Sequence, residues 1–254
     1  MRFSHAIVRK PCKNFTEGLS SAGLGKPDYS LALRQHHEYV RALEICRLEV
    51  TVLPPDEEYP DSTFVEDTAL LTRYIAITTR PGAESRLGEI NEVHRAVGSY
   101  YENIFTIHEP GTLEAGDVMM AGEHFYIGIS ERTNREGARQ LLQILEHHGI
   151  TASLVEVPGM LHLKTGISYL ENNTFLAVDT FRMHPEFRHR NIIPVPNHEA
   201  YAANSLWVNG MVLVPQGFPI TLKNIRNTGY ETIELDISEF RKLDGGLSCL
   251  SLRF

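Results

Sequence analysis

The sequence is poor in cysteine and tryptophan, with three and one among its 254 residues, and it has no long apolar run. Cys12, Cys46 and Cys249 are odd in number and widely spaced, so they form neither a disulfide framework nor a CxxC pair. A reducing compartment, the cytoplasm, is therefore the expected location. No apolar stretch approaches the roughly 18 residues of a membrane span, and residues 1–5 lack the apolar segment of a signal peptide.

Positive charge is also in short supply. Lysine and arginine together number 24 against 32 aspartates and glutamates, which gives a formal net charge of −8. This balance excludes a general nucleic-acid binder, which needs a basic face. An acidic excess suits a cationic small molecule instead. The pairs His36-His37 and His147-His148 point to different faces of their predicted helices, so neither is expected to bind a metal ion.

Hydrophobic periodicity predicts a unit of strand, hairpin and helix that recurs about five times, at intervals of roughly 40–50 residues. The predicted helices cover residues 28–46, 84–101, 133–148 and 219–229. The predicted hairpins cover residues 69–79, 117–129, 167–178 and 205–214, the last across Asn209-Gly210. Further strands are predicted over residues 161–163 and 247–252, and the second is expected to meet the strand Ala6–Val8. Such repeats imply one radial domain over residues 1–254 with a central channel. A doubly wound open sheet is the alternative, and the frequent hairpins speak against it.

Polar residues recur where each predicted hairpin begins. They are Glu66-Asp67, then Glu114 and Asp117, then His162, then Asn204, and finally Cys249 beside the Gly245-Gly246 turn. In a radial fold equivalent strand ends face one axis, so we expect a thiol, an imidazole and carboxylates to meet in one pocket.

This set of groups suits chemistry on a guanidinium. Carboxylates bind a guanidinium through paired charge-assisted bonds, and a thiolate attacks its central carbon. His162 would transfer protons, and Glu114 would orient its ring. Each residue also has a plainer interpretation: Cys249 as a core residue, His162 as an ordinary strand histidine, and the acidic residues after Pro60 as a solvated turn. The glycine-rich loop over residues 14–27 is equally compatible with a lid and with a mobile surface loop.

Six stretches carry a resemblance to a known family. They are Leu24–Tyr29, Pro60–Asp67, Thr79–Arg86, Glu114–Asp117, Leu161–Gly166 and Asp244–Cys249. Together they resemble the dimethylarginine dimethylaminohydrolases (dimethylargininases) of the guanidino-group modifying, or pentein, superfamily. The resemblance spans nearly the whole chain and keeps the order of the family's motifs.

The resemblance implies a five-bladed α/β propeller of pseudo-fivefold ββαβ-type repeats. It implies hydrolysis of Nω-methylated arginines to citrulline and a methylamine, without a metal or organic cofactor. Cys249 then resembles the nucleophile, His162 the general acid/base, and Glu114 the residue that supports the site. The substrate contacts would be Asp67 as the principal guanidinium clamp, Glu66 and Asp61 in the same acidic pocket, Arg86 and Arg132 at the α-carboxylate, and the backbone of Leu19 and Leu243 at the α-amino group.

Three other functions stay open at this point. Arginine deiminases, which act on free arginine, share the cysteine–histidine–acid set. A cationic amino-acid binding protein would need an inert Cys249. A cysteine peptidase is disfavoured, because the expected pocket is too acidic for a neutral amide. A homodimer is expected from the family, since outer strands and helices are free to pair.

Overall fold

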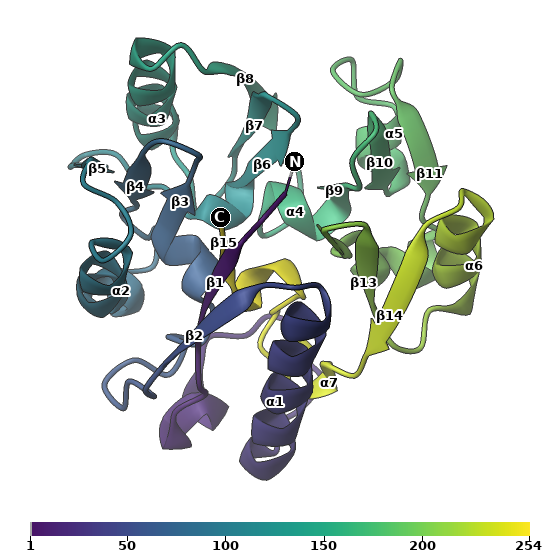
Figure 1. Ribbon diagram of the computed structural model, residues 1–254, viewed down its shortest axis with the longest axis horizontal. Helices are drawn as coiled ribbons and strands as arrows, with labels where there is room; N and C mark the ends of the chain where they lie inside the picture. The colour runs from purple at the N-terminus through teal and green to yellow at the C-terminus, as the bar shows by residue number, and fades with distance from the viewer. Residues whose placement is uncertain (1) are drawn as a thin grey trace.

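The computed structural model describes residues 2–254, and within them the strands form five three-stranded sheets around a central axis (Figure 1). The inner strands are β3 (Ala69–Leu71), β6 (Val118–Ala121), β9 (Ile167–Tyr169), β12 (Leu206–Val208) and β15 (Leu252–Arg253). The middle strands are β1 (His5–Arg9), β4 (Ala76–Thr78), β7 (His124–Ile129), β10 (Thr174–Ala177) and β13 (Met211–Pro215). The outer strands are β2 (Glu49–Leu53), β5 (Ile104–Thr106), β8 (Thr151–Glu156), β11 (Asn191–Pro194) and β14 (Glu231–Leu235).

Every blade has the same pairing. The inner and middle strands are antiparallel, whereas the middle and outer strands are parallel. A parallel pair needs a crossover, and here each crossover carries a helix. These helices are α1 (Tyr29–Ile45), α2 (Ile90–Val97), α3 (Arg135–His147), α5 (Asp179–Arg182) and α6 (Pro219–Asn227). They lie on the outside of the ring (Figure 1).

The two ends of the chain close the ring. β1 pairs with β15 in the antiparallel register Ala6↔Arg253 and Ile7↔Leu252, and with β2 in parallel. The amides of Ser4 and His5 both donate to the carbonyl of Phe254, at 2.8 and 2.9 Å. The expected five-bladed α/β propeller and its closure by both termini are confirmed.

Local chemistry sets where the long helices begin. Asp28 accepts a hydrogen bond from the amide of Leu31, at 2.7 Å, and Asn134 accepts one from Gly137, at 2.8 Å. Such N-caps stabilise a helix by about 1 kcal/mol each. The predicted helix over residues 84–101 is divided: a 3₁₀ segment, η3 (Glu84–Glu89), precedes α2.

A short helical segment precedes each inner strand and faces the axis; four of the five are single turns, and η5 is longer and kinked. These segments are η2 (Val65–Thr68), η4 (Ala115–Asp117), α4 (Leu163–Gly166), η5 (Asn197–Ala203) and η6 (Ser248–Leu250). The polar residues noted in the sequence lie on or beside these segments, one group from each blade. The remaining short helices are η1 (Lys13–Glu17) and α7 (Ser238–Arg241).

Two predicted strands are wrong for the same reason. Residues 161–163 lead into α4, and residues 248–250 form η6, so the closing strand is only Leu252–Arg253. Side chains satisfy the backbone amides that a strand would pair. Asp117 accepts from the amide of Leu163, at 2.8 Å, and Asn204 accepts from the amide of Ser248, at 2.9 Å. Cys249 therefore projects from a turn and not from a strand.

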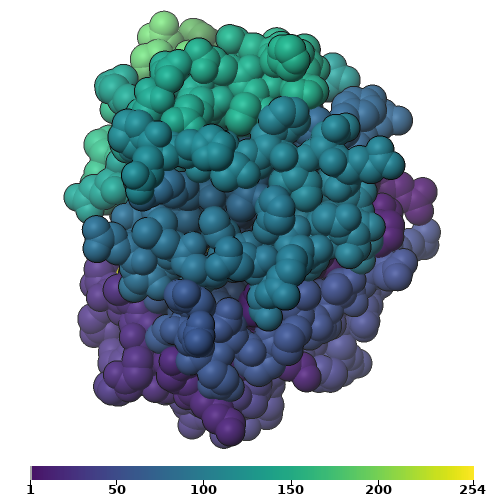
Figure 2. Space-filling view, turned by 90° about the vertical axis from the view of Figure 1, so that its left-hand side faces the viewer, coloured from purple at the N-terminus to yellow at the C-terminus, as the bar shows by residue number. Residues whose placement is uncertain are grey.

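An open groove lies where β5 meets α3 on the outer surface, on the side of the ring that Figure 2 shows. Its lining includes Phe105, His108, Gln140, Ile144 and His147. It contains none of the residues expected to act on substrate. Among residues 2–254, no helix has the length and apolar character that crossing a membrane requires.

Candidate active site

Where the turns converge, a small pocket of about 30 Å³ opens between them. Cys249 and His162 line it together, with Gly116, Lys164, Thr165, Tyr201, Asn204, Asp244, Gly246 and Ser248. These residues come from four different blades. The thiol and the imidazole, 87 positions apart in the chain (249 minus 162), thus share one cavity.

Cys249 sits half-buried in the middle of η6. Its amide donates to the carbonyl of Gly246, at 3.2 Å, and the amide of Gly246 donates back to its Sγ, at 3.4 Å. Burial raises the pKa of the thiol to about 12, and the nearby charges of Asp67 and Glu66 act in the same direction. The thiol is therefore protonated at neutral pH when the pocket is empty.

His162 forms a buried ion pair with Glu114, with 2.7 Å between Nε2 and Oε2. Burial alone would lower the pKa of His162, but Asp67, the hydrogen bond with Glu114 and the charge of Asp117 raise it to about 9. Burial alone would raise the pKa of Glu114, but its hydrogen bond with His162, together with Arg86 and Arg132, lowers it to about 2. At neutral pH the pair is an imidazolium and a carboxylate, so His162 holds a proton that it can donate.

Asp67 lies between His162 and Arg86. Its Oδ1 accepts from the amide of Gly116, at 3.1 Å, and is 4.0 Å from Nε2 of His162, while its Oδ2 pairs with Arg86 at 2.7 Å. A Cβ on Gly116 would stand 2.7 Å from Nδ1 of His162 and 2.8 Å from Oδ1 of Asp67. Only glycine lets the turn η4 approach both groups this closely.

The two arginines differ in how free they are. Arg86 is buried, with its guanidinium shared between Asp67, Glu89 at 2.9 Å and the carbonyl of Phe64 at 3.2 Å. Arg132 is 22% exposed at its side chain and lies 3.5 Å from Oε1 of Glu114. Arg132 is thus the cation with room for a further carboxylate, whereas Arg86 must share its donors.

The loop over residues 18–27 contacts the edge of the site. Both carboxylate oxygens of Asp61 accept from the amide of Leu19, at 3.0 and 3.2 Å. Farther along the loop, Ser21 donates from its amide to Asp244, which itself lines the pocket. Leu243 packs beside Gly18, where a Cβ would be 3.0 Å from its Cδ1. Within residues 2–254 no hydrogen bond reaches the carbonyl of Leu19 or Leu243.

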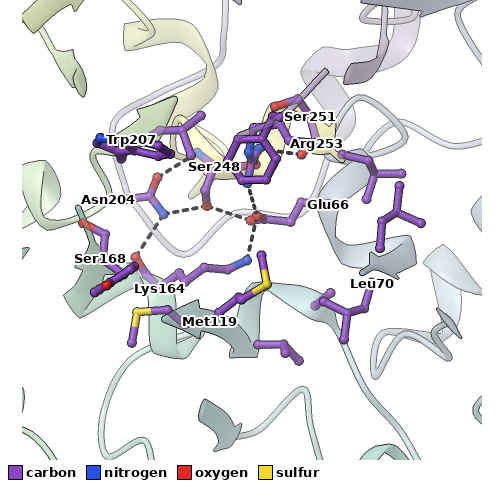
Figure 3. A pocket seen from close by; sticks show the side chains of 18 of the residues that line it. Glu66, Leu70, Met119, Lys164, Ser168, Asn204, Trp207, Ser248, Ser251 and Arg253 are labelled. Carbon is purple, nitrogen blue, oxygen red and sulfur yellow. Dashed lines mark hydrogen bonds and ion pairs between the residues drawn. The ribbon is translucent and has the colours of Figure 1, made fainter. Parts of the chain in front are cut away.

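Glu66 faces away from the thiol pocket. Its carboxylate accepts from Oγ of Ser248 at 2.6 Å and pairs with Lys164 at 2.6 Å and Arg253 at 3.1 Å. It lines a second cavity of about 130 Å³ on the other side of this contact (Figure 3). Sequence reasoning missed Lys164, two residues after His162, and Ser248, directly before Cys249; this closeness in the chain was the available signal.

Asp67, Glu114 and His162 also form the one cluster of metal-ligand type found among residues 2–254, with ligand atoms within 4.8 Å of one another. Its oxygen and nitrogen donors could hold a divalent cation. Arg86 already places positive charge against two of these carboxylates, at 2.7 Å from Asp67 and 3.9 Å from Glu114. A metal ion on Nε2 of His162 would have to replace its hydrogen bond with Glu114 and lie beside that guanidinium.

Comparison with known proteins gives consistent results. The family model for arginine deiminase matches residues 94–204. A dimethylarginine dimethylaminohydrolase from Pseudomonas aeruginosa is 54% identical over 99% of this chain and 100% of that protein. One from Streptomyces coelicolor is 36% identical over 98% of this chain and 96% of that protein. The solved structure of a C249S mutant of the Pseudomonas aeruginosa enzyme, complexed with citrulline, superposes with a TM-score of 0.99 at 53% identity, covering 100% of both chains.

Fold and site define a five-bladed α/β propeller with a cysteine, a histidine and carboxylates at its axis, the architecture of the pentein class. Within that class, the identity with the Pseudomonas aeruginosa dimethylarginine dimethylaminohydrolase extends over 99% of this chain. The chain belongs to the dimethylarginine dimethylaminohydrolase family.

Proposed function

We propose that the chain hydrolyses Nω-methylated L-arginines, asymmetric dimethylarginine and monomethylarginine, to L-citrulline and a methylamine. The observation that carries this proposal is the shared pocket: a thiol and an imidazolium line one cavity, and the carboxylates of Glu114 and Asp67 lie 2.7 and 4.0 Å from Nε2 of that imidazolium. Solved structures of relatives contain citrulline, and in another case an adduct with S-methyl-L-thiocitrulline, so the family's site accepts ligands of this shape.

In the first half of the proposed reaction, Asp67 binds the guanidinium and brings its positive charge to Cys249. The thiol releases its proton to solvent, and Sγ attacks the central guanidinium carbon. The tetrahedral adduct collapses when the C–N bond to the methylated nitrogen breaks. That nitrogen takes a proton from His162 and leaves as the methylamine, and a thiouronium remains on Cys249.

The second half returns the enzyme to its starting state. His162, now neutral, accepts a proton from water, whose oxygen bonds to the same carbon. The C–S bond then breaks, and the proton of the new hydroxyl passes to sulfur as the C=O of citrulline forms, so Cys249 recovers its thiol. Glu114 keeps the imidazole ring oriented throughout by the 2.7 Å hydrogen bond.

The amino-acid end of the substrate needs contacts outside the thiol pocket. We assign its α-carboxylate to Arg132, with Arg86 as the second and partly shared donor. We assign its α-amino group to Asp61 and the carbonyls of Leu19 and Leu243, which lie together at the edge of the loop. In this assignment Glu66 accepts a hydrogen bond from Ser248, the residue before Cys249, and does not contact the guanidinium directly.

Mass spectrometry of intact protein, quenched during turnover of dimethylarginine, tests the covalent step. We expect a mass increase that maps to Cys249 and is absent from Cys249→Ser, which also loses citrulline formation. Substantial turnover by Cys249→Ser would refute the nucleophile assignment. A binding protein without catalysis would show neither the adduct nor citrulline.

A deiminase acting on free L-arginine is the second candidate, because the arginine deiminase family model matches the segment that contains Glu114 and His162. Side-by-side kcat/KM values for arginine, monomethylarginine and asymmetric dimethylarginine separate the two. A strong preference for the unmethylated substrate would favour the deiminase.

We further infer a homodimer in the cytoplasm. Three free cysteines suit a reducing compartment, and the outer strands of the blades leave edges that can pair. Light scattering after size-exclusion chromatography checks the mass of the particle, and fractionation of the source cells checks the compartment.

A further inference from the structure

One buried polar side chain at the axis has no part in the proposed reaction. Asn204 follows η5 and is only 7% exposed; it lies in the segment before the inner strand, where the other blades carry Asp67, His162 or Cys249. The sequence marks it as one of the recurring polar residues. Its amide uses both the oxygen and the nitrogen, and each bond reaches a residue one or two positions from Cys249 or His162.

Two hydrogen bonds connect the Asn204 amide with η6, the turn that carries Cys249. Oδ1 of Asn204 accepts from the amide of Ser248 at 2.9 Å, and Nδ2 donates to Oγ of Ser248 at 3.0 Å. Ser248 directly precedes Cys249. A Cβ on Gly246 would stand 2.5 Å from the Asn204 side chain, so the turn that carries the thiol lies flat against this amide.

A third hydrogen bond connects the Asn204 amide with α4, the turn that follows His162. Nδ2 of Asn204 also donates to the carbonyl of Lys164, at 3.0 Å. Lys164 lies in α4, which begins directly after His162. A single planar amide therefore spans the turn of the thiol and the turn of the imidazole.

The chain of bonds extends to a third blade (Figure 3). Oγ of Ser248 accepts from Asn204 and donates to Oε2 of Glu66, at 2.6 Å. Glu66 in turn precedes Asp67. Every hydroxyl and amide group in this chain has its partner, and buried networks that are fully satisfied hold one geometry.

We propose that Asn204 is a positioning residue that fixes Cys249 relative to His162. This inference rests on the proposed function, since it assumes that the thiol attacks and the imidazole donates. A displacement of about 1 Å in such a pair lowers the rate by on the order of 10²-fold.

The test replaces Asn204 by aspartate, which keeps Oδ1 but cannot donate to the carbonyl of Lys164. We expect kcat for dimethylarginine to fall on the order of 10²-fold, with KM within about threefold of wild type. Inactivation of Cys249 by a haloacetamidine should change in the same way in this variant: the limiting rate should fall, and the half-saturating concentration should stay the same. Ser248→Ala removes the bridging hydroxyl without adding charge, and its kcat should fall in the same direction.

Asn209→Asp is the matched control. Asn209 also makes three hydrogen bonds, each of 2.9 Å: its Oδ1 accepts from the amide of Phe3, and its Nδ2 donates to the carbonyls of Phe3 and Cys46. It does not line the thiol pocket. We expect this variant to lose thermal stability and to keep kcat. A positioning role predicts that only the Asn204 variant loses kcat at a temperature where both are folded.

Coupling between the two positions gives a second readout. Because Asn204 and Ser248 share a hydrogen bond, the kcat losses of Asn204→Ala and Ser248→Ala should not multiply in the double variant. If Asn204→Asp and Ser248→Ala both keep kcat and the inactivation rate within threefold of wild type, the inference is wrong. Full turnover by Cys249→Ser would instead overturn the proposed function, so the two failures are distinguishable.

Discussion

The resting state of Cys249 leads to a prediction about which reagents alkylate it. With a pKa of about 12, the thiolate fraction at pH 7 is on the order of 10⁻⁵. A guanidinium or amidinium about 4 Å from sulfur contributes ~4 kcal/mol at an effective dielectric constant of about 20. Since 1.36 kcal/mol corresponds to about one pKa unit, the bound cation lowers the pKa of the thiol by roughly three units. The cation thus raises the thiolate fraction on the order of 10³-fold.

The assay compares a cationic haloacetamidine with the neutral iodoacetamide. Each rate constant is divided by the rate of the same reagent with a free low-molecular-weight thiol at its own pKa, and labelling of Cys249→Ser is subtracted to remove Cys12 and Cys46. We expect the normalised rate of the cation to exceed that of the neutral reagent on the order of 10³-fold at pH 7. The neutral reagent should gain about tenfold per pH unit up to pH 10, without a plateau.

A preformed thiolate would give the opposite result. The neutral reagent would then react at a rate independent of pH above about 7, and the two normalised rates would agree within a few-fold. Either outcome would refute the protonated resting state and the role that we give to the substrate's charge. Asp67→Asn should reduce the advantage of the cation and leave the neutral reagent unaffected or faster, because Asp67 raises the pKa of the thiol.

Three further predictions concern the fold around the site. His162 has a raised pKa, so its ion pair stabilises the folded state fully below pH 6.5 and loses that contribution as the pH rises through about 9. The maximum contribution to the free energy of unfolding is about 3 kcal/mol. It is measured by urea unfolding as a function of pH, and His162→Gln should remove this pH dependence. Gly116→Ala should abolish citrulline formation, because the added Cβ would overlap His162 and Asp67 and push one of them out of position. Full activity of this variant would contradict the close approach of η4 to these two side chains. Deletion of residues 250–254 removes β15 and should lower the melting temperature and the activity together; a stable and active truncated protein would show that β1 does not need its antiparallel partner.

Much of the fold could be predicted because its elements have local causes. The helix from Tyr29 begins at the aspartate that caps it, and the hairpin at Asn209-Gly210 forms where that pair of residues favours a tight turn. The order of the units then restricted the topology to a ring. The short turns were missed because period-two alternation over six residues, as in Leu247–Leu252, does not distinguish a strand from one helical turn followed by two strand residues.

The candidate site also has a part that could be predicted from the sequence and a part that could not. The residue types at the blade starts predicted that Cys249 and His162 would share a pocket, and the structure places them in one. The contacts of Glu66 could not be predicted, because they depend on which side of η2 faces Lys164 and Arg253 across the axis. Arg86 likewise pairs with Glu89, three residues along its own 3₁₀ segment, and a sequence position alone cannot show that competition. The substrate roles assigned to these residues stay predictions.

The position of the site makes its geometry depend on the closure of the ring. Cys249 lies three residues before the start of β15, and the strand that fixes β15 is β1, from the other end of the chain. Asp67, Glu114 and His162 enter the axis from blades that close independently of this contact. A weaker β1–β15 pairing would thus move the thiol while leaving the carboxylates and the imidazole in place. Because Asn204 ties the turn of Cys249 to α4 directly, it can hold the thiol in register even when β15 frays, and this is why a buried amide with no contact to the reacting atoms belongs in the account of catalysis.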